Sequence, residues 1–230
     1  MKIRAILTGS TGMVGEGVLK ECLIHPDVEK ILVVNRHPCG ISHPKLTEII
    51  HPNFLDITSI RNQLKGYNAC FFCLGVSSIG MDKGKYYSVT YDVTMHFAGI
   101  LSQQNPDMVF CYISGAGTDS SEKGKLHWAR VKGKTENDLM KLPFKSVYNF
   151  RPGFLQPSKD LKNVKKYYNF FNILFPVLKP MFPQYVSTLK ELGLAMINSV
   201  LKGYKKHVLE VRDIVGLAAT KPFSISQTPL

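Results

Sequence analysis

The sequence of 230 residues lacks a long apolar run. Its first apolar run ends at Thr8 and Gly9, which predicts a first strand rather than the apolar core of a signal peptide. No later run reaches the roughly 18 residues that a membrane-spanning helix requires. With 44% hydrophobic residues, the chain can bury a sizeable core as one domain, or as one domain with a small lobe. We therefore expect a cytoplasmic protein.

Cysteines are few and odd in number, since the chain has five. A framework of disulfides is not expected, and a reducing compartment fits better. Cys70 and Cys73 form a C-x-x-C motif, but they lie in the apolar, strand-like run "NACFFCLG". Side chains three residues apart on a strand point to opposite faces, so this pair cannot hold one metal ion or close a disulfide. We predict buried strand cysteines and no metal site.

Acidic residues are scarce, because 17 Asp and Glu stand against 29 Lys and Arg and leave a net charge of +12. This excess favours an anionic ligand or surface without choosing between them. No nucleic-acid-binding motif accompanies the charge, so we expect no nucleic acid as partner. The basic, aromatic stretch 159–206 leaves a membrane surface open as a partner. A substrate pocket or core packing explains its aromatic residues more economically.

Apolar runs rich in β-forming residues alternate with segments of helical spacing. The runs are "KIRAIL", "KILVVN", "LTEII", "ACFFCLG", "MVFCYIS" and "SVYNF". Such near-continuous apolar stretches predict strands buried on both faces, as in a parallel sheet between helices. Residues 12–25, 86–104 and 122–141 show the apolar spacing of helices. The alternation predicts an α/β fold with a doubly wound parallel sheet.

The character of the sequence changes after residue 157. Pro176, Pro180 and Pro183 interrupt the apolar pattern that follows, so short helices are expected there. We predict a core over residues 1–157 and a small helical cap or substrate region over 158–206. A last strand and helix, in "HVLEV" and "RDIVGLAA", are predicted to return to the core over 207–230.

Gly9, Gly12 and Gly15 directly follow the first predicted strand and open the first predicted helix, in "ILTGSTGMVGEGVL". Glycines at this spacing permit a tight turn, close approach of backbone to a pyrophosphate, and close packing of helix on strand. The helix N-terminus adds free N–H groups and the positive end of its dipole. The stretch therefore predicts a dinucleotide-binding loop, with a purely structural turn as the weaker alternative.

Five motifs carry a family resemblance. They are "TGSTGMVG", "CLGVSS", "YISGAG", "WARVKGKTE" and "FRPGFLQP". Together they resemble atypical short-chain dehydrogenase/reductases, related to the NADPH-binding Tat-interacting protein and to epimerase-like Rossmann proteins. The resemblance covers residues 2 to about 157 well and the rest loosely. It implies a Rossmann fold that binds NAD(P).

The resemblance also implies which residues contact the cofactor. They are Gly9, Thr11, Gly12, Met13, Val14, Gly15, Asn35, Arg36, Asp56, Leu74, Gly75, Val76, Lys132, Pro152 and Gly153. Asp56 matches an acidic residue that binds adenine in the resembling proteins, although a helix cap before "ITSIRNQL" explains it equally well.

The cofactor preference is predicted from "VVNRHP", at the end of the second strand. An Asp or Glu normally reads the ribose 2′-hydroxyl at this point, but Asn35 and Arg36 carry no negative charge. Arg36 can instead form a bidentate pair with a 2′-phosphate, with a solvated loop arginine as the alternative. We predict that NADP(H) binds at least about ten times more tightly than NAD(H), a difference of about 1.4 kcal/mol.

The predicted catalytic residues are Ser114, Trp128 and Lys132. Ser114 ends the fifth strand, where the family pattern has a Ser or Thr that hydrogen-bonds the substrate carbonyl. Trp128 and Lys132 are spaced i, i+4 and share a helix face, and Trp128 stands where the family pattern has Tyr. An indole cannot relay a proton as a phenol does, so another group has to supply it. The candidates are Tyr86, Tyr87 and His127.

The sequence therefore predicts an NADP(H)-binding oxidoreductase of the atypical short-chain type, acting on a small carbonyl or alcohol substrate. NAD is the less favoured cofactor. The alternative is a non-catalytic NADPH-binding protein, whose occupancy alters its contacts with a partner. The sequence predicts neither the substrate nor the oligomeric state.

Overall fold

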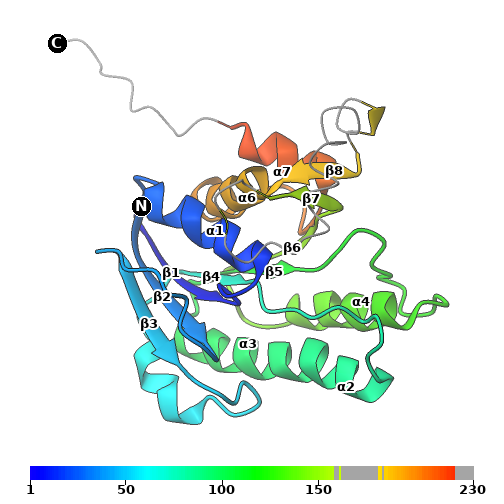
Figure 1. Cartoon of the computed structure of the whole chain (residues 1–230), viewed down its shortest axis with the longest axis horizontal. Helices are drawn as coiled ribbons and strands as arrows, with labels where there is room; N and C mark the ends of the chain where they lie inside the picture. The colour runs from blue at the N-terminus through cyan, green and yellow to red at the C-terminus, as the bar shows by residue number, and fades with distance from the viewer. Residues whose placement is uncertain (158–160, 162–180, 183, 221–230) are drawn as a thin grey trace.

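The structure is a computed structural model that describes residues 1–157, 161, 181–182 and 184–220 (Figure 1). Much of the predicted cap over 158–206, with its three prolines and its aromatic stretch, lies outside the described residues. The same holds for 221–230. The predicted domain boundaries therefore stay predictions.

Seven parallel strands form the main sheet, in the order β3-β2-β1-β4-β5-β6-β9. Their bounds are β1 (Ile3–Thr8), β2 (Val28–Asn35), β3 (Leu46–Ile50), β4 (Ala69–Phe72), β5 (Val109–Ile113), β6 (Ser146–Arg151) and β9 (Val208–Glu210). The chain first builds outward from β1 to β3, then crosses to the other side of β1 with β4. This order confirms the predicted doubly wound α/β sheet.

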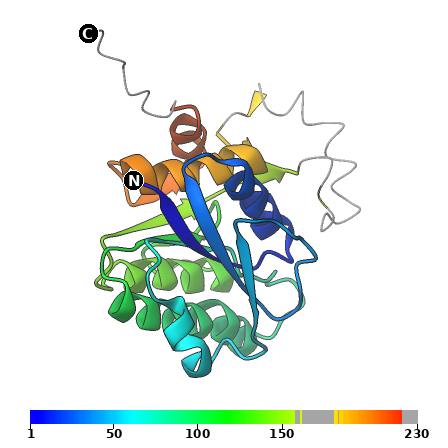
Figure 2. The same ribbon diagram turned by 90° about the vertical axis from the view of Figure 1, so that its left-hand side faces the viewer.

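Helices cover both faces of this sheet (Figure 1). One face carries α1 (Met13–Ile24), α6 (Leu189–Lys202) and α7 (Val211–Ala218). The other carries η1 (Thr58–Leu64), α2 (Lys83–Tyr87), η2 (Ser88–Asp92), α3 (Val93–Gln104) and α4 (His127–Leu139). Figure 2 shows the twisted sheet between the two helical layers. The arrangement is the three-layer packing expected when strands are apolar on both faces.

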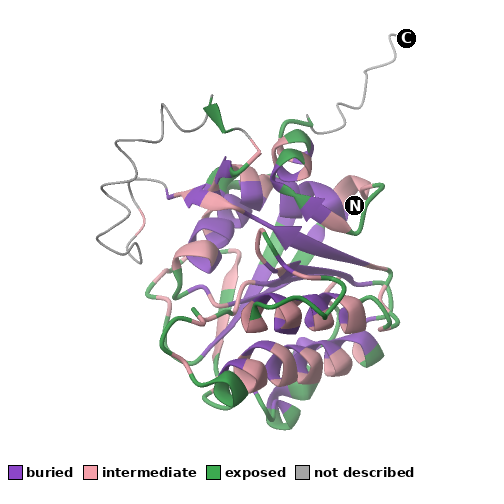
Figure 3. Ribbon diagram, turned by 90° about the vertical axis from the view of Figure 1, so that its right-hand side faces the viewer, coloured by how far each residue is buried: buried purple, intermediate pink, exposed green. Residues whose placement is uncertain are grey.

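The strands β1, β2, β4, β5 and β6 are largely buried (Figure 3). They separate two apolar clusters, one on each face of the sheet. Along β1, Ala5 and Leu7 pack in the cluster beneath α1 and α6, whereas Ile6 packs in the cluster beneath α3. The two cysteines of the C-x-x-C motif divide in the same way, with Cys73 on the first side and Cys70 on the second. The predicted opposite orientation of Cys70 and Cys73 is confirmed.

Two predicted helices differ from the observed ones at their amino-terminal sides. Residues 122–126 form a loop instead of the first turns of α4. The carboxylate of Asp119 organises this loop, because it accepts hydrogen bonds from the backbone N–H groups of Ser121 at 3.0 Å and Gly124 at 2.6 Å. Glu122 adopts a positive φ of 61°, which no helix tolerates. The predicted helix 86–104 is three joined segments, since η2 inserts a π turn between α2 and α3.

The last elements return to the sheet after a small side structure. β7 (Phe154–Gln156) and β8 (Val186–Thr188) form a separate parallel pair. Thr188 then begins α6 with a capping box, in which its hydroxyl accepts from the backbone N–H of Glu191 at 3.0 Å. α6 packs beside α1, where Gly17 leaves space for the side chain of Leu189. None of the described helices is long and apolar enough to cross a membrane.

Candidate functional site

A cavity of about 210 Å³ opens at the carboxyl ends of β1, β4 and β5. Its lining residues are Gly12, Met13, Val14, Gly15, Cys73, Leu74, Gly75, Val76, Ile113 and Lys132. Eight of these ten were predicted from the sequence, all except Cys73 and Ile113. The cavity lies where the strand order reverses between β1 and β4, which is the place where open α/β sheets bind their ligands.

The three glycines of the first loop differ in whether the fold requires a glycine at their position. Gly9 has a positive φ of 75°, and a Cβ there would lie 2.7 Å from the carbonyl oxygen of Cys73. At Gly15 a Cβ would collide with the backbone of Gly9. Gly12 is free of both constraints, because its φ is −105° and its added Cβ would meet only the Gly9 oxygen, at 3.5 Å. The fold requires Gly9 and Gly15, whereas a side chain at Gly12 would enter open space beside the N-terminus of α1.

The end of β2 holds a hydrogen-bonded chain of three side chains. Asn35 is 2% exposed, and its amide donates to the hydroxyl of Ser10 at 2.6 Å and to the carboxylate of Glu48 at 3.0 Å. Arg36, the next residue, is exposed. Sequence reasoning missed Glu48, although it is the one charged residue within the apolar strand "LTEII" and that was an available signal.

Asp56 forms a turn just before η1. Its carboxylate accepts a hydrogen bond from the backbone N–H of Thr58 at 3.0 Å, and bonds to Thr58 lower the pKa of the Asp56 carboxyl. The side chain is exposed and does not line the cavity. The structure thus shows a turn-forming hydrogen bond at Asp56 rather than a helix cap, since the N-cap of η1 is Ile57, and a contact with adenine stays a prediction.

Lys132 joins α4 to the end of β5. Its ammonium donates to the backbone carbonyls of Ile113 at 3.2 Å and Ser114 at 3.1 Å. Burial lowers the pKa of Lys132 to about 8, and the carboxylate of Glu136 partly opposes this shift. Ser114 is 6% exposed and its hydroxyl lies 2.9 Å from that of Thr118. Of the predicted catalytic residues, Lys132 lines the cavity and Ser114 lies next to it in the chain.

Trp128 lies one helical turn before Lys132 and is half-buried. Its ring packs over the backbone of Gly117, where an added Cβ would lie 3.6 Å from the indole Cη2 atom. Trp128 does not line the 210 Å³ cavity. Tyr87 and His127, two of the candidate proton donors, line another hollow of about 260 Å³. Tyr86, the third, is 2% exposed.

The R-P-G motif holds neighbouring segments together. The carbonyl of Pro152 accepts from the backbone N–H of Ala116 at 3.0 Å. A Cβ on Gly153 would collide with the carbonyl of Tyr185, so a glycine is needed for the chain before β8 to approach β7. These contacts explain the motif through packing, and its contact with a cofactor stays a prediction.

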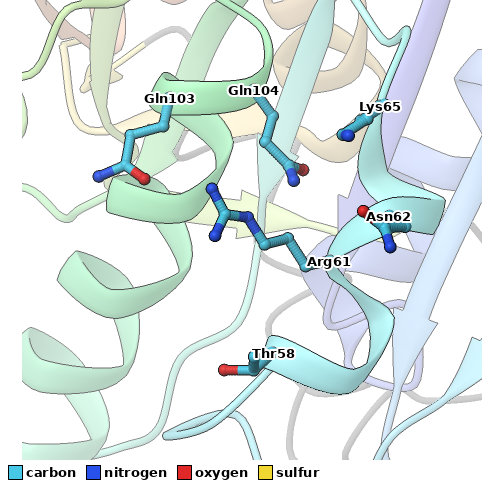
Figure 4. Close-up of a pocket in the computed structure, with 6 residues that line it drawn as sticks. All are labelled: Thr58, Arg61, Asn62, Lys65, Gln103 and Gln104. Carbon is cyan, nitrogen blue, oxygen red and sulfur yellow. The ribbon is translucent and has the colours of Figure 1, made fainter.

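A larger cavity lies elsewhere, between η1 and the end of α3 (Figure 4). It has a volume of about 560 Å³ and is lined by Thr58, Arg61, Asn62, Lys65, Gln103 and Gln104. We place the site at the smaller cavity, because only that one combines the strand ends, the glycine loop and Lys132. Among the described residues, no three His, Cys, Asp or Glu side chains come together as a metal-binding group.

Solved structures identify the fold. The chain superposes on the Bordetella bronchiseptica enzyme WbmG in complex with NAD with a TM-score of 0.68, at 11% identity over 95% of this chain and 77% of that one. A UDP-N-acetylglucosamine 4-epimerase from Methanobrevibacter ruminantium gives 0.64, at 14% identity over 94% and 81%. A short-chain dehydrogenase family protein from Francisella tularensis gives 0.60, at 16% identity over 88% and 93%. The fold is that of the epimerase-like short-chain dehydrogenase/reductases. This confirms the resemblance at the level of fold.

Curated relatives match this chain over two thirds of its length or more, at low identity. Protein FMP52, mitochondrial, from Meyerozyma guilliermondii is 24% identical over 223 residues, which are 95% of this chain and 94% of the relative. The protein of the same name from Debaryomyces hansenii is 26% identical over 69% of this chain and 71% of its own. No protein-family model matches the chain. The predicted cytoplasmic location is wrong in the light of these relatives, since they are named mitochondrial.

Proposed function

We propose that the protein is a nicotinamide-dinucleotide-dependent oxidoreductase that prefers NADP(H) and acts on a small carbonyl or alcohol substrate. Gly12 carries the proposal. The fold does not require a glycine at this position, and the open space beside it is where a pyrophosphate meets the N-terminus of α1 in this type of fold. The NAD complex of WbmG, which shares the fold, supports the same cofactor class.

Different groups of the protein bind different parts of the dinucleotide. Backbone N–H groups at the start of α1 face the pyrophosphate, and Leu74, Gly75 and Val76 form the wall on the opposite side of the cavity. Lys132 has three N–H donors and uses two on backbone carbonyls, which leaves one for a ribose hydroxyl. Exposed Arg36 pairs with a 2′-phosphate. When bound, the nicotinamide supplies or accepts a hydride.

Proton transfer is the step for which the described lining of the cavity offers no group besides Lys132. Trp128 stands on the helix face of Lys132 but has no acceptor and no useful acid, so it orients or stacks on a substrate rather than relaying a proton. Ser114 orients the carbonyl after its hydroxyl turns from Thr118. Loss of a positioned general acid costs about a hundredfold to ten-thousandfold in rate, so we expect slow turnover.

The second candidate is a non-catalytic dinucleotide-binding protein, and Trp128 is the observation that favours it. A dinucleotide then serves as a ligand whose occupancy changes the contacts of the protein with a partner.

We also propose that the protein is located at mitochondria, as the names of its FMP52 relatives suggest for them. Fractionation of source cells tests this location.

The test is a titration followed by a turnover assay. Isothermal calorimetry with NADPH and NADH measures binding, and a panel of aldehydes and ketones measures oxidation of NADPH. Binding with turnover supports the oxidoreductase, and binding without any turnover supports the non-catalytic candidate. If neither dinucleotide binds a folded protein, both candidates are wrong.

A further inference from the structure

A carboxylate from β3, that of Glu48, lies at the end of β2. The sequence of β2 itself contains no acidic residue at this end. Asn35 is the last residue of β2, and the register of the parallel pair aligns it with Ile50 of β3. Glu48 aligns with Val33, so Glu48 and Asn35 lie on the same face of the sheet, two positions apart. This register brings the Glu48 carboxylate to 3.0 Å from the Asn35 amide.

The carboxylate is fixed in this position by its donors. Besides Asn35, the backbone N–H of Cys39 donates to it at 2.9 Å, and the Cys39 thiol also interacts with it. Among the described residues, Glu48 forms no ion pair with a lysine, arginine or histidine. Its carboxylate is therefore hydrogen-bonded but, within the part of the chain that the structure describes, has no cation at ion-pair distance.

The charge lies beside the loop that receives the dinucleotide. Asn35 links Glu48 to Ser10, which stands between Gly9 and Gly12 in the glycine loop. The carbonyl-type oxygen of the Asn35 amide is buried and has no hydrogen-bond partner. In a sheet of this type the adenosine ribose lies over this point, between the glycine loop and the end of β2. The Glu48 carboxylate is thus two hydrogen bonds away from the glycine loop, close to the place that Rossmann sheets use for the adenosine ribose.

We propose that Glu48, supplied by β3, is a determinant of dinucleotide choice that acts against Arg36. A carboxylate accepts a hydrogen bond from a ribose 2′-hydroxyl and repels a 2′-phosphate. Arg36 favours the phosphate for the opposite reason. The protein therefore binds NADH better than the sequence "VVNRHP" indicates. The ratio of the dissociation constants of NADH and NADPH is smaller than it would be with Arg36 alone. This inference rests on the proposed dinucleotide site.

The test is the ratio of the dissociation constants of NADH and NADPH, measured by calorimetry on one preparation of each variant. Glu48→Gln removes the charge and keeps an acceptor oxygen of nearly the same shape. We expect it to raise the ratio about tenfold, because NADPH binds more tightly and NADH more weakly. Since both ligands are measured on the same sample, any unfolded fraction lowers both affinities equally and leaves the ratio unchanged.

Glu29→Gln is the matched control, because Glu29 is an exposed carboxylate near the amino end of β2, the strand that pairs with β3. The same change in net charge there should leave the ratio within about twofold. If both dinucleotides bind and Glu48→Gln shifts the ratio no more than Glu29→Gln does, this inference is wrong and the proposed function stands. If the folded wild-type protein binds neither dinucleotide, the proposed function and this inference are both overturned.

Discussion

The ammonium of Lys132 lies 3.1 Å from the backbone carbonyl oxygen of Ser114, across the junction of α4 and β5. A second carbonyl, of Ile113, lies 3.2 Å from the same nitrogen. The lysine is thereby held at the end of the sheet by two backbone acceptors, and its ammonium also lies over the ring of Tyr112, 5.4 Å from the ring centre. In the proposed site its third N–H donates to the ligand. The Lys132 side chain therefore connects α4 to the end of β5 and also lines the cavity.

The first prediction concerns pH. The folded pKa of Lys132 is about 8, below its ordinary value of 10.5, so the ammonium is present below about pH 8 and is lost as pH rises through that value. NADPH affinity should therefore fall across this range. Lys132→Met should weaken binding near neutral pH by about 1.5 to 3 kcal/mol and abolish the pH dependence. Calorimetry between about pH 6.5 and 9 measures both effects. Exposed Lys141→Met is the control, and an unchanged pH profile in Lys132→Met would refute the role.

The second prediction uses the different reasons for the three glycines. Gly12→Val should abolish NADPH binding with little change in the melting temperature, because its side chain fills ligand space and meets little protein. Gly99→Ala in α3 is the control, since an added Cβ there also meets nothing within 4 Å. Calorimetry and thermal melting check the pair. Tight NADPH binding by folded Gly12→Val would show that the dinucleotide does not bind beside Gly12.

The third prediction concerns Arg36. Arg36→Ala should weaken NADPH binding at least about tenfold and leave NADH binding nearly unchanged, because only NADPH carries the 2′-phosphate. Arg61→Ala removes the same charge from the distant cavity of Figure 4 and should affect neither ligand. Equal losses for the two dinucleotides in Arg36→Ala would show that the arginine acts through general charge.

The fourth prediction concerns Trp128. Trp128→Tyr places a phenol one helical turn before Lys132, but the space at this position is shaped for an indole, which packs over Gly117. We expect a small gain in carbonyl reduction or none, measured as NADPH oxidation over a panel of aldehydes and ketones. Efficient turnover by the wild-type protein that is unaffected by Trp128→Phe would show that the proton comes from elsewhere.

The fifth prediction concerns stability. Arg151 forms a buried ion pair with Glu136, at 2.5 Å, and the Glu136 side chain is 1% exposed. Arg151→Met should destabilise the fold by about 3 to 5 kcal/mol, since it leaves a buried carboxylate without its cation. Lys141→Met breaks an exposed pair with Asp138 and should cost about 1 kcal/mol or less. Urea unfolding measures the loss in free energy of unfolding for each variant. Equal losses would show that the Arg151–Glu136 pair is no more important to stability than an ion pair with an exposed lysine.

The sequence by itself determined the layered fold and the place of the cavity. Apolar runs such as β1 and β4 are buried on both faces whatever their partners, so their pattern is sufficient to predict a parallel sheet between helices. Gly9, Gly12 and Gly15 belong to one turn, and a turn is specified by local backbone geometry. The opposite orientation of Cys70 and Cys73 likewise follows from the two-residue period of a strand.

Only the tertiary structure decided which side chains meet. Glu48 reaches Asn35 because β2 and β3 pair in one register, and a shift of one residue would turn Glu48 to the other face. The sequence at the end of β2 carries no sign of that carboxylate. In the same way, the two carbonyls that hold Lys132 come from a strand 18 and 19 residues earlier. Such contacts depend on long-range pairing, which local patterns do not contain.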